Sequence, residues 1–252
     1  MFPSTGLIVN ADDFGLSPGV NRGIEEAFGY GIVTSASLMV RAKAAEDAAR
    51  FARAHPDLSV GLHLDLGEWI HERGRWVPAY EVVPLSDPRA VNAEVAAQLT
   101  RFKRLVGHAP THLDSHQHVH LLEPVRSVVE RLRARIGIPV RGLDDRVGHL
   151  GDFYGQTGEG LPIEGAITVD GLIRLLDRLR PGWTELSCHP GRDDALDSVY
   201  SRERSVEVDT LTDPRVVAHL ARRGIELRSY RHLSDHGQPR IAGCVTFVGA
   251  PA

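Results

Sequence analysis

Short apolar runs alternate with stretches of helical periodicity over most of this chain. Residues 6–10 form a buried-strand pattern, and Ser17-Pro18 then predicts the start of a helix that continues over residues 21–30. Further strand patterns lie at residues 34–40, 58–66, within 111–120, and at 138–140, 184–188 and 225–230. Further helix patterns lie at residues 42–54, 88–106, 125–135, 167–179 and 214–223. This alternation predicts an α/β domain with a mainly parallel sheet, closer to a barrel of about seven strand–helix units than to an open sheet.

Three segments lack a clear period. Residues 68–87 contain several aromatic residues, and we expect an irregular excursion over one mouth of the fold, whose rings either stack on a sugar face or pack the segment itself. Residues 141–166 are rich in Gly and Asp, and we expect them to form a loop over the same mouth. Residues 199–208 are also expected in a loop. We predict one catalytic domain over residues 1–233, followed by a tail over residues 234–252 whose order the sequence leaves open.

Composition narrows the class of protein. The chain has 252 residues, of which 42% are hydrophobic and 25% charged, as is normal for a soluble globular protein. A formal net charge of −4, with no block of like charge, argues against a nucleic-acid partner. Two cysteines make no disulfide framework and fit a reducing compartment. No signal peptide is recognisable, and no apolar stretch approaches the roughly 18 residues of a membrane span. We therefore expect a cytoplasmic protein that, if it oligomerises, forms a homodimer.

A histidine-rich stretch at residues 111–120 carries the most unusual pattern. It holds four of the chain's 13 histidines and one carboxylate, at His112, Asp114, His116, His118 and His120. These positions share one parity, so in an extended strand their side chains point the same way. Such a row suits a divalent metal or a proton-transfer site, although a solvated strand edge is the plain alternative. A metal site usually gathers ligands from several elements, so further ligands are expected elsewhere.

Other polar residues follow the ends of predicted strands. Asp12 and Asp13 come directly after the first strand, His63 lies in the third, and His189 follows the strand at residues 184–188. Taken singly, these residues have plain explanations, such as a helix-capping turn or a core imidazole. Because the carboxyl ends of parallel strands meet at one face, we expect them to converge with the histidine-rich stretch. Two imidazoles and a carboxylate make a workable catalytic metal centre, with a second carboxylate as base and a further histidine as acid.

Four segments together resemble the YdjC family of carbohydrate deacetylases, the group that includes chitooligosaccharide deacetylases and hopanoid-associated homologues. The matching segments are Asn10-Ala-Asp-Asp-Phe-Gly15, Gly61-Leu-His63, Thr111-His-Leu-Asp-Ser-His-Gln-His-Val-His120 and Cys188-His-Pro-Gly191, with Tyr200, Arg204 and Glu207 trailing. The resemblance spans residues 5–233 and implies a deformed (β/α) barrel, similar to polysaccharide deacetylases. It also implies hydrolysis of an N-acetyl group from an amino sugar, in an N-acetylglucosamine-containing oligosaccharide or glycolipid, with release of acetate.

The same resemblance implies roles for individual residues. One divalent metal ion, Mg²⁺ or Zn²⁺, is expected on Asp13, His63 and His116. Asp12 is then the expected general base, and His189 the candidate acid.

The remaining positions are less constrained. Asp114 is expected to orient a neighbour or a catalytic group. His118 and His120 are expected either to contact substrate or to hold ligands by hydrogen bonds, and Arg204 is assigned to substrate binding. His112 is expected to be structural. The segment at residues 141–166 matches no part of the family pattern, which leaves substrate size open.

Three alternatives remain to be weighed. A metal phosphoesterase also uses clustered His and Asp, but it usually needs two metals and more carboxylates. A sugar-binding protein without turnover is weakened because every proposed catalytic position is filled. A cysteine hydrolase is disfavoured, because Cys188 and His189 are neighbours on a strand and point to opposite faces. No Gly-x-Gly-x-x-Gly or P-loop pattern indicates a nucleotide.

Overall fold

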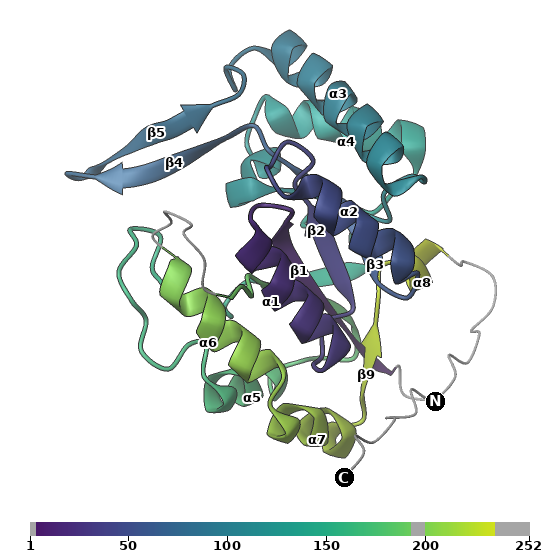
Figure 1. Ribbon diagram of the computed structural model, residues 1–252, viewed down its shortest axis with the longest axis vertical. Helices are drawn as coiled ribbons and strands as arrows, with labels where there is room; N and C mark the ends of the chain where they lie inside the picture. The colour runs from purple at the N-terminus through teal and green to yellow at the C-terminus, as the bar shows by residue number, and fades with distance from the viewer. Residues whose placement is uncertain (1–3, 193–199, 235–252) are drawn as a thin grey trace.

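The computed structural model describes residues 4–192 and 200–234. Within these residues, seven strands form one parallel sheet (Figure 1). They are β1 (Thr5–Phe14), β2 (Ser35–Leu38), β3 (Ser59–Leu64), β6 (Leu113–Ser115), β7 (Val147–Leu150), β8 (Gly182–Cys188) and β9 (Ile225–Arg228). Their order is β6-β3-β2-β1-β8-β7, and β9 pairs with the first half of β1 while β2 pairs with its second half. The long first strand is therefore the centre of the sheet.

Helices cover the outer face of this sheet. They are α1 (Pro18–Gly29), α2 (Ala45–Ala54), α3 (Pro88–Val106), α4 (Val125–Ile136), α5 (Val169–Leu176), α6 (Ser201–Leu211), α7 (Pro214–Arg223) and the short α8 (Arg231–Ser234). Neighbouring helices touch in the order α4-α3-α2-α1-α6-α5-α7, which follows the curl of the sheet (Figure 1). The result is a curled half-barrel of parallel strands, which confirms the predicted fold class. In the described part of the chain, no helix combines the length and apolar character that crossing a membrane requires.

The start of the first helix follows the sequence signal. Ser17 has an extended backbone, its Oγ accepts a hydrogen bond from the Val20 amide at 3.1 Å, and Pro18 occupies the first helical position. Helix α7 begins in the same way at Asp213 and Pro214 and covers the predicted residues. Local capping chemistry therefore sets both helix starts.

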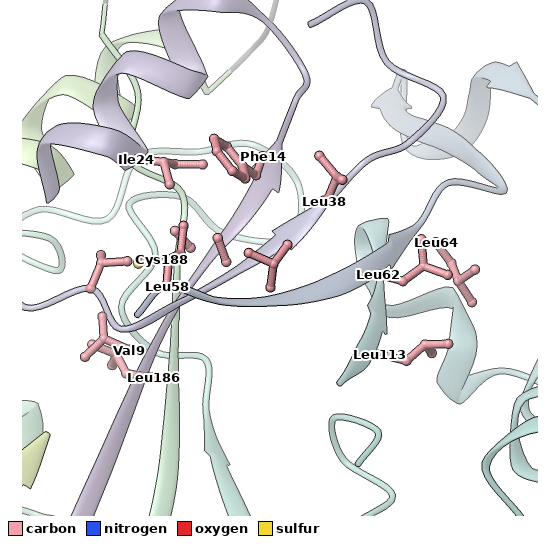
Figure 2. Close-up of a cluster of buried hydrophobic side chains, with 14 of the residues drawn as sticks. Val9, Phe14, Ile24, Leu38, Leu58, Leu62, Leu64, Leu113, Leu186 and Cys188 are labelled. Carbon is pink, nitrogen blue, oxygen red and sulfur yellow. The ribbon is translucent and has the colours of Figure 1, made fainter. Parts of the chain in front are cut away.

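Alternation along the strands separates an apolar outer layer from a polar interior. Leu7, Val9 and Ala11 of β1 belong to the hydrophobic cluster between sheet and helices, which Figure 2 shows around Val9, Phe14 and Leu186. Asn10 and Asp12 alternate with them and point to the other face. Cys188 lies in the same apolar cluster, as expected for a side chain that faces the helical layer. The inner face is thus left free for polar side chains.

The prediction of an irregular segment at residues 68–87 is wrong. This segment forms an antiparallel hairpin of β4 (Gly67–Glu72) and β5 (Arg75–Glu81), which projects away from the body of the fold (Figure 1). Its turn residues Arg73 and Gly74 have φ angles of 51° and 80°. Two consecutive positive φ angles are what a tight two-residue hairpin requires.

Two further segments are more regular than expected. Residues 141–166 contain β7, an edge strand paired with β8, in which only Val147 is buried and the apolar alternation is lost. Residues 201–211 form helix α6 and not a loop. The buried face of α6 includes Arg204 and Glu207, and these charged residues hid its amphipathic pattern.

The histidine-rich stretch is extended only as far as Ser115. A 3₁₀ segment follows over His116–Leu121, in which Gln117 and His118 have φ angles of 51° and 54°. The shared direction expected of all five polar side chains therefore ends with β6. The brief strand expected at residues 138–140 is reduced to one bridge between Leu113 and Val140. The predicted tail lies, from residue 235 onward, outside the described residues.

Candidate metal centre and active site

The three predicted metal ligands converge at the carboxyl ends of the strands. Asp13 comes from the end of β1, His63 from β3, and His116 from the residue after β6. Asp13 Oδ1 lies 3.3 Å from His63 Nε2 and 3.1 Å from His116 Nδ1. One oxygen and two imidazole nitrogens of this group lie within 4.8 Å of one another, so the group can hold a metal ion.

The backbone at Asp13 brings two adjacent carboxylates to one site. Asp13 has a φ of 65°, and the pairing of β1 with β2 shifts register between Ala11 and Phe14. Asp12 and Asp13 therefore both lie beside His63, each in a group that can hold a metal. Left-handed backbone at a non-glycine residue costs free energy, and such positions concentrate at functional sites.

The hydrogen bonds of His63 fit a cation between the three ligands. His63 Nδ1 lies 2.7 Å from Asp114 Oδ1, so the neutral ring would carry its proton on Nδ1 and direct the lone pair of Nε2 toward Asp13. Two acceptors facing each other need a proton or a metal between them. Burial opposes the charged ring, but the carboxylates of Asp114, Asp13 and Asp12 outweigh it and raise the pKa of His63 to about 10. The site therefore attracts positive charge.

A second group that could hold a metal consists of Asp12, His63 and Asp114, but the guanidinium of Arg141 already neutralises its carboxylates. Arg141 Nη1 donates to Asp12 Oδ2 at 2.6 Å, and Nη2 donates to Asp12 Oδ1 at 2.7 Å. Nη2 also lies 2.9 Å from Asp114 Oδ2. Because Arg141 bonds both oxygens of Asp12, whereas Oδ1 of Asp13 faces the nitrogens of His63 and His116, the group of Asp13 fits a metal better.

A third carboxylate holds Arg141 from the other side. Glu185 Oε1, on β8, accepts from Arg141 Nε at 2.9 Å and from Nη2 at 2.7 Å. The hydroxyl of Tyr230 donates to Glu185 Oε2 at 2.5 Å. All three residues are at most 2% exposed, so these contacts are shielded from water. The orientation of Asp12 is thus fixed by a chain of hydrogen bonds that runs through Arg141 and Glu185 to Tyr230, just after β9.

His112 packs behind the site, as its expected structural role requires. Its ring stacks on Tyr230 with 3.9 Å between centroids, and its Nε2 lies 3.0 Å from Ser37 Oγ. Ser37 Oγ in turn donates to Asp114 Oδ2 at 2.6 Å. Gly61 makes room for the ring, since a Cβ there would lie 2.5 Å from His112 Cε1. The glycine of the Gly61-Leu-His63 segment therefore has a packing reason.

His189, the candidate acid, lies beside Asp12. Its Nε2 lies 3.8 Å from Asp12 Oδ2, and its buried Nδ1 has no hydrogen-bond partner among the described residues. The rings of Tyr154 and Tyr200 pack edge-on against it at 5.2 and 5.8 Å. Burial, opposed by the aspartates and reinforced by nearby guanidinium groups, lowers the pKa of His189 to about 4.

The two histidines expected to contact substrate or hold ligands, His118 and His120, differ in burial and in their hydrogen bonds. His120 is fully buried, with Nδ1 2.7 Å from Ser115 Oγ and Nε2 3.0 Å from the Arg141 carbonyl oxygen, a placement that favours a structural role. His118 is half-buried, its Nδ1 has no partner in the described part of the chain, and its ring packs edge-on against His149 at 5.5 Å. Of the two histidines, only His118 keeps a ring nitrogen available.

Arg204 is buried and bonded to Asp13, one of the predicted metal ligands. Its Nη2 donates to Asp13 Oδ2 at 2.6 Å, and its Nη1 donates to the His189 carbonyl oxygen at 3.2 Å. Arg204 is 6% exposed, so its guanidinium is positioned to bond other protein groups more readily than a substrate. The contact with Asp13 leaves Oδ1 of that carboxylate as the oxygen nearest the two imidazoles.

The base of the hairpin is bound to the loop that carries His116. Gln117 Oε1 accepts from the Trp69 amide at 2.8 Å, and Gln117 Nε2 donates to the Trp69 carbonyl at 2.7 Å. Glu68 Oε2 lies 4.0 Å from His116 Nε2. The hairpin therefore begins at the edge of the candidate metal centre.

Sequence reasoning missed Arg141 and Glu185, and it named Glu207 without assigning it a role. Arg141 directly follows the brief strand pattern at residues 138–140, so the strand-end rule that found the other residues applies to it as well. Glu185 interrupts an otherwise apolar strand, and a charge in such a place usually has a buried partner. Glu207 carried no signal beyond its place in the family pattern.

Comparisons with known proteins show the family to which this chain is similar. The family model described as YdjC-like protein matches residues 6–222. A carbohydrate deacetylase of Geobacillus stearothermophilus is 41% identical over 245 residues, covering 89% of this chain and 96% of that protein. A chitooligosaccharide deacetylase of Klebsiella pneumoniae (strain 342) is 38% identical over 256 residues, covering 89% of this chain and 98% of that protein.

Solved structures support the fold. A protein of Enterococcus faecalis V583, described as a proposed cellobiose-phosphate cleavage protein, is 27% identical and superposes with a TM-score of 0.75 over 91% of this chain and 99% of its own. A peptidoglycan N-acetylglucosamine deacetylase shares the fold alone, with 12% identity and a TM-score of 0.56 over 90% of this chain and 89% of its own. The match of the family model and the identity to these relatives over nearly the whole chain show that this protein belongs to the YdjC-like family.

Proposed function

We propose that this protein is a metal-dependent deacetylase that hydrolyses the N-acetyl group of an amino sugar and releases acetate. The observation that carries the proposal is the convergence of Asp13, His63 and His116 beside an Asp12 carboxylate gripped by Arg141. Relatives named carbohydrate deacetylase and chitooligosaccharide deacetylase, at 41% and 38% identity, support the reaction class.

The metal ion would be held by Asp13, His63 and His116. Its chemistry, when it is bound, is to polarise the acetyl carbonyl and to lower the pKa of the attacking water. Two imidazoles and one carboxylate favour a zinc-like ion, while Mg²⁺ prefers a site made of oxygen ligands. We therefore propose Zn²⁺ or a similar transition ion ahead of Mg²⁺.

The protein's own residues supply the proton transfers. Burial raises the pKa of Asp12, but the positive charge of Arg141 outweighs this effect and lowers the pKa to about 2. Asp12 is therefore ionised at neutral pH and can accept a proton from the attacking water. Arg141 keeps the Asp12 carboxylate in one orientation. His189 faces Asp12 at 3.8 Å and delivers a proton to the amine nitrogen as its bond to the acetyl carbon breaks. The lowered pKa of His189 means that the resting ring is neutral, so the proton that it delivers to the amine is the one that Asp12 has taken from the attacking water and passed to His189.

The expected substrates are oligosaccharides or glycolipids that contain N-acetylglucosamine. The hairpin that begins beside His116 carries Trp69, Trp76 and Tyr80, of which Trp76 is 55% exposed and Tyr80 is 39% exposed. Aromatic side chains on such an arm offer faces on which sugar rings can stack. The hairpin and the segment around Tyr154 are therefore the parts that set substrate length.

Acetate release across N-acetylated mono- and oligosaccharides and glucosamine lipids, with and without a chelator, tests this function. We expect acetate from at least one class, loss of turnover with chelator, and recovery on adding back metal. Orthophosphate release from sugar phosphates would instead indicate a phosphoesterase. Saturable sugar binding without acetate release would indicate a binding protein. A homodimer remains a prediction, which sedimentation equilibrium tests.

A further inference from the structure

Helix α6 holds the backbone of the candidate acid from both sides of one peptide segment. Glu207 Oε2 accepts from the His189 amide at 2.5 Å, while Arg204 Nη1 donates to the His189 carbonyl oxygen at 3.2 Å. Arg204 and Glu207 are three residues apart, so they share one face of the helix. In addition, the Gly191 amide donates to the Arg204 carbonyl at 3.1 Å. Both main-chain groups of His189 are therefore bonded to one helix face.

The second oxygen of Glu207 is also used. The Tyr200 hydroxyl donates to Glu207 Oε1 at 2.5 Å and accepts from the Gly155 amide at 2.8 Å. The ring of Tyr200 packs edge-on against His189, and it stacks on Tyr154 with 4.3 Å between centroids. Glu207 is fully buried, and it thereby ties the backbone of His189 to the aromatic wall around its ring.

The contacts of Glu207 and Arg204 with the His189 backbone stand in for a hydrogen bond that would otherwise orient the His189 ring. Catalytic imidazoles are commonly oriented by a carboxylate or carbonyl on their second nitrogen, but the buried Nδ1 of His189 has no partner within residues 4–192 and 200–234. Its ring direction must therefore be set through the backbone and through packing. Because Arg204 also donates to Asp13 at 2.6 Å, the same helix face holds the metal ligand and the acid at a fixed separation.

We propose that Glu207 is a positioning residue, which fixes His189 through its backbone amide and through Tyr200 for protonation of the leaving amine. The inference rests on the proposed deacetylase function for its kinetic consequence. Its structural content, a backbone clamp on His189, stands independently of that function. Glu207 itself touches neither substrate nor metal in this account.

The test is the variant Glu207→Gln, which keeps the shape but presents an NH₂ group to one of the two donors. Asp209→Asn is the matched control, since it removes a charge from the same helix at an exposed ion pair with Arg192. Tyr200→Phe is the second variant, for use if Glu207→Gln does not fold, because it weakens the clamp from its other end.

Two readouts separate this proposal from the function itself. In ¹⁵N-histidine-labelled protein, with the His189 amide assigned by the variant His189→Gln, we expect its proton signal to move upfield in Glu207→Gln and to stay in place in Asp209→Asn. In steady-state kinetics we expect kcat on an N-acetylated sugar to fall about 10- to 100-fold with little change in KM. Hydrolysis of 4-nitrophenyl acetate, whose leaving group needs no proton, should fall far less.

An unchanged His189 amide signal, or equal loss of sugar and aryl-ester turnover, would overturn the positioning role. If wild-type protein releases no acetate from any N-acetylated sugar, the proposed function fails. The amide signal then still decides whether the clamp exists.

Discussion

Arg141 holds the carboxylate of Asp12 through two parallel hydrogen bonds, at 2.6 Å to Oδ2 and at 2.7 Å to Oδ1. The guanidinium is buried among Asp12, Asp114 and Glu185, so its one positive charge faces three carboxylates. A bidentate contact fixes direction as well as charge. The proposed base is therefore locked in place before any substrate arrives.

Replacing this arginine by lysine should separate geometry from charge. Arg141→Lys keeps the positive charge but loses the planar fork, so we expect kcat to fall about 10- to 100-fold and unfolding free energy to fall by about 2 kcal/mol. Acetate release and urea denaturation measure the two effects. Arg146→Lys is the control, because Arg146 also pairs with a buried aspartate, Asp144, while its own side chain is 41% exposed. Wild-type turnover in Arg141→Lys would show that the fork does not position the base.

The two adjacent aspartates should separate catalysis from metal binding. In Asp12→Asn we expect turnover to fall about 10²- to 10⁴-fold while metal affinity is kept, because Asp12 serves as base and not as ligand. In Asp13→Asn we expect metal affinity itself to fall. Competition titration with a chromophoric chelator gives the affinities. Unchanged turnover in Asp12→Asn would remove the base assignment.

A methyl group at Gly61 should disturb the site from behind. The Cβ of Gly61→Ala would lie 2.5 Å from His112 Cε1, so the ring must move away from Ser37 and Tyr230. We expect a loss of about 1–3 kcal/mol in unfolding free energy, measured by urea denaturation. Gly158→Ala has nothing within 4 Å of its added carbon and should unfold as the wild type does. Equal stability of the two variants would show that the fit around His112 is loose.

The buried ring of His112 should make stability depend on pH. Burial lowers the pKa of His112 to about 4, so between that pH and its ordinary value of 6.5 the unfolded chain binds a proton that the folded protein does not. Stability from this residue is present above pH 6.5 and is lost as the pH falls to about 4, by up to about 3 kcal/mol.

The variant His112→Gln isolates that contribution, since other buried histidines titrate in both proteins. The stability advantage of wild type over the variant, from urea denaturation at several pH values, should shrink on going from pH 6.5 to pH 4. An advantage that stays constant across this range would mean that His112 does not resist protonation in the folded protein.

The order of the main elements and the convergence of the site could be predicted from sequence. Apolar runs and helix caps such as Ser17-Pro18 are local signals, and the strand-end rule of parallel sheets brings Asp13, His63 and His116 together without any knowledge of side-chain packing. What failed was the assumption of regular alternation. A positive φ at Asp13 and a 3₁₀ turn after Ser115 redirect side chains in ways that parity does not foresee.

The supporting residues could not be predicted because tertiary contacts define them. Helix α6 has a buried face that includes Arg204 and Glu207, whose partners lie on the chain segment around His189 and on β1. A charged residue reads as solvent-facing until its partner is known. The hairpin was missed for a different reason. Its alternating residues and the Arg73-Gly74 turn are local signals in the sequence, but the prolines in and after the second strand favoured an irregular segment.

Anomalous X-ray diffraction from crystals grown with Zn²⁺ tests the central claim most directly. We predict one strong peak bounded by Asp13 Oδ1, His63 Nε2 and His116, with Asp12 still bonded to Arg141. A peak between Asp12, His63 and Asp114, with Arg141 displaced, would contradict the account, as would the absence of any peak at this end of the sheet.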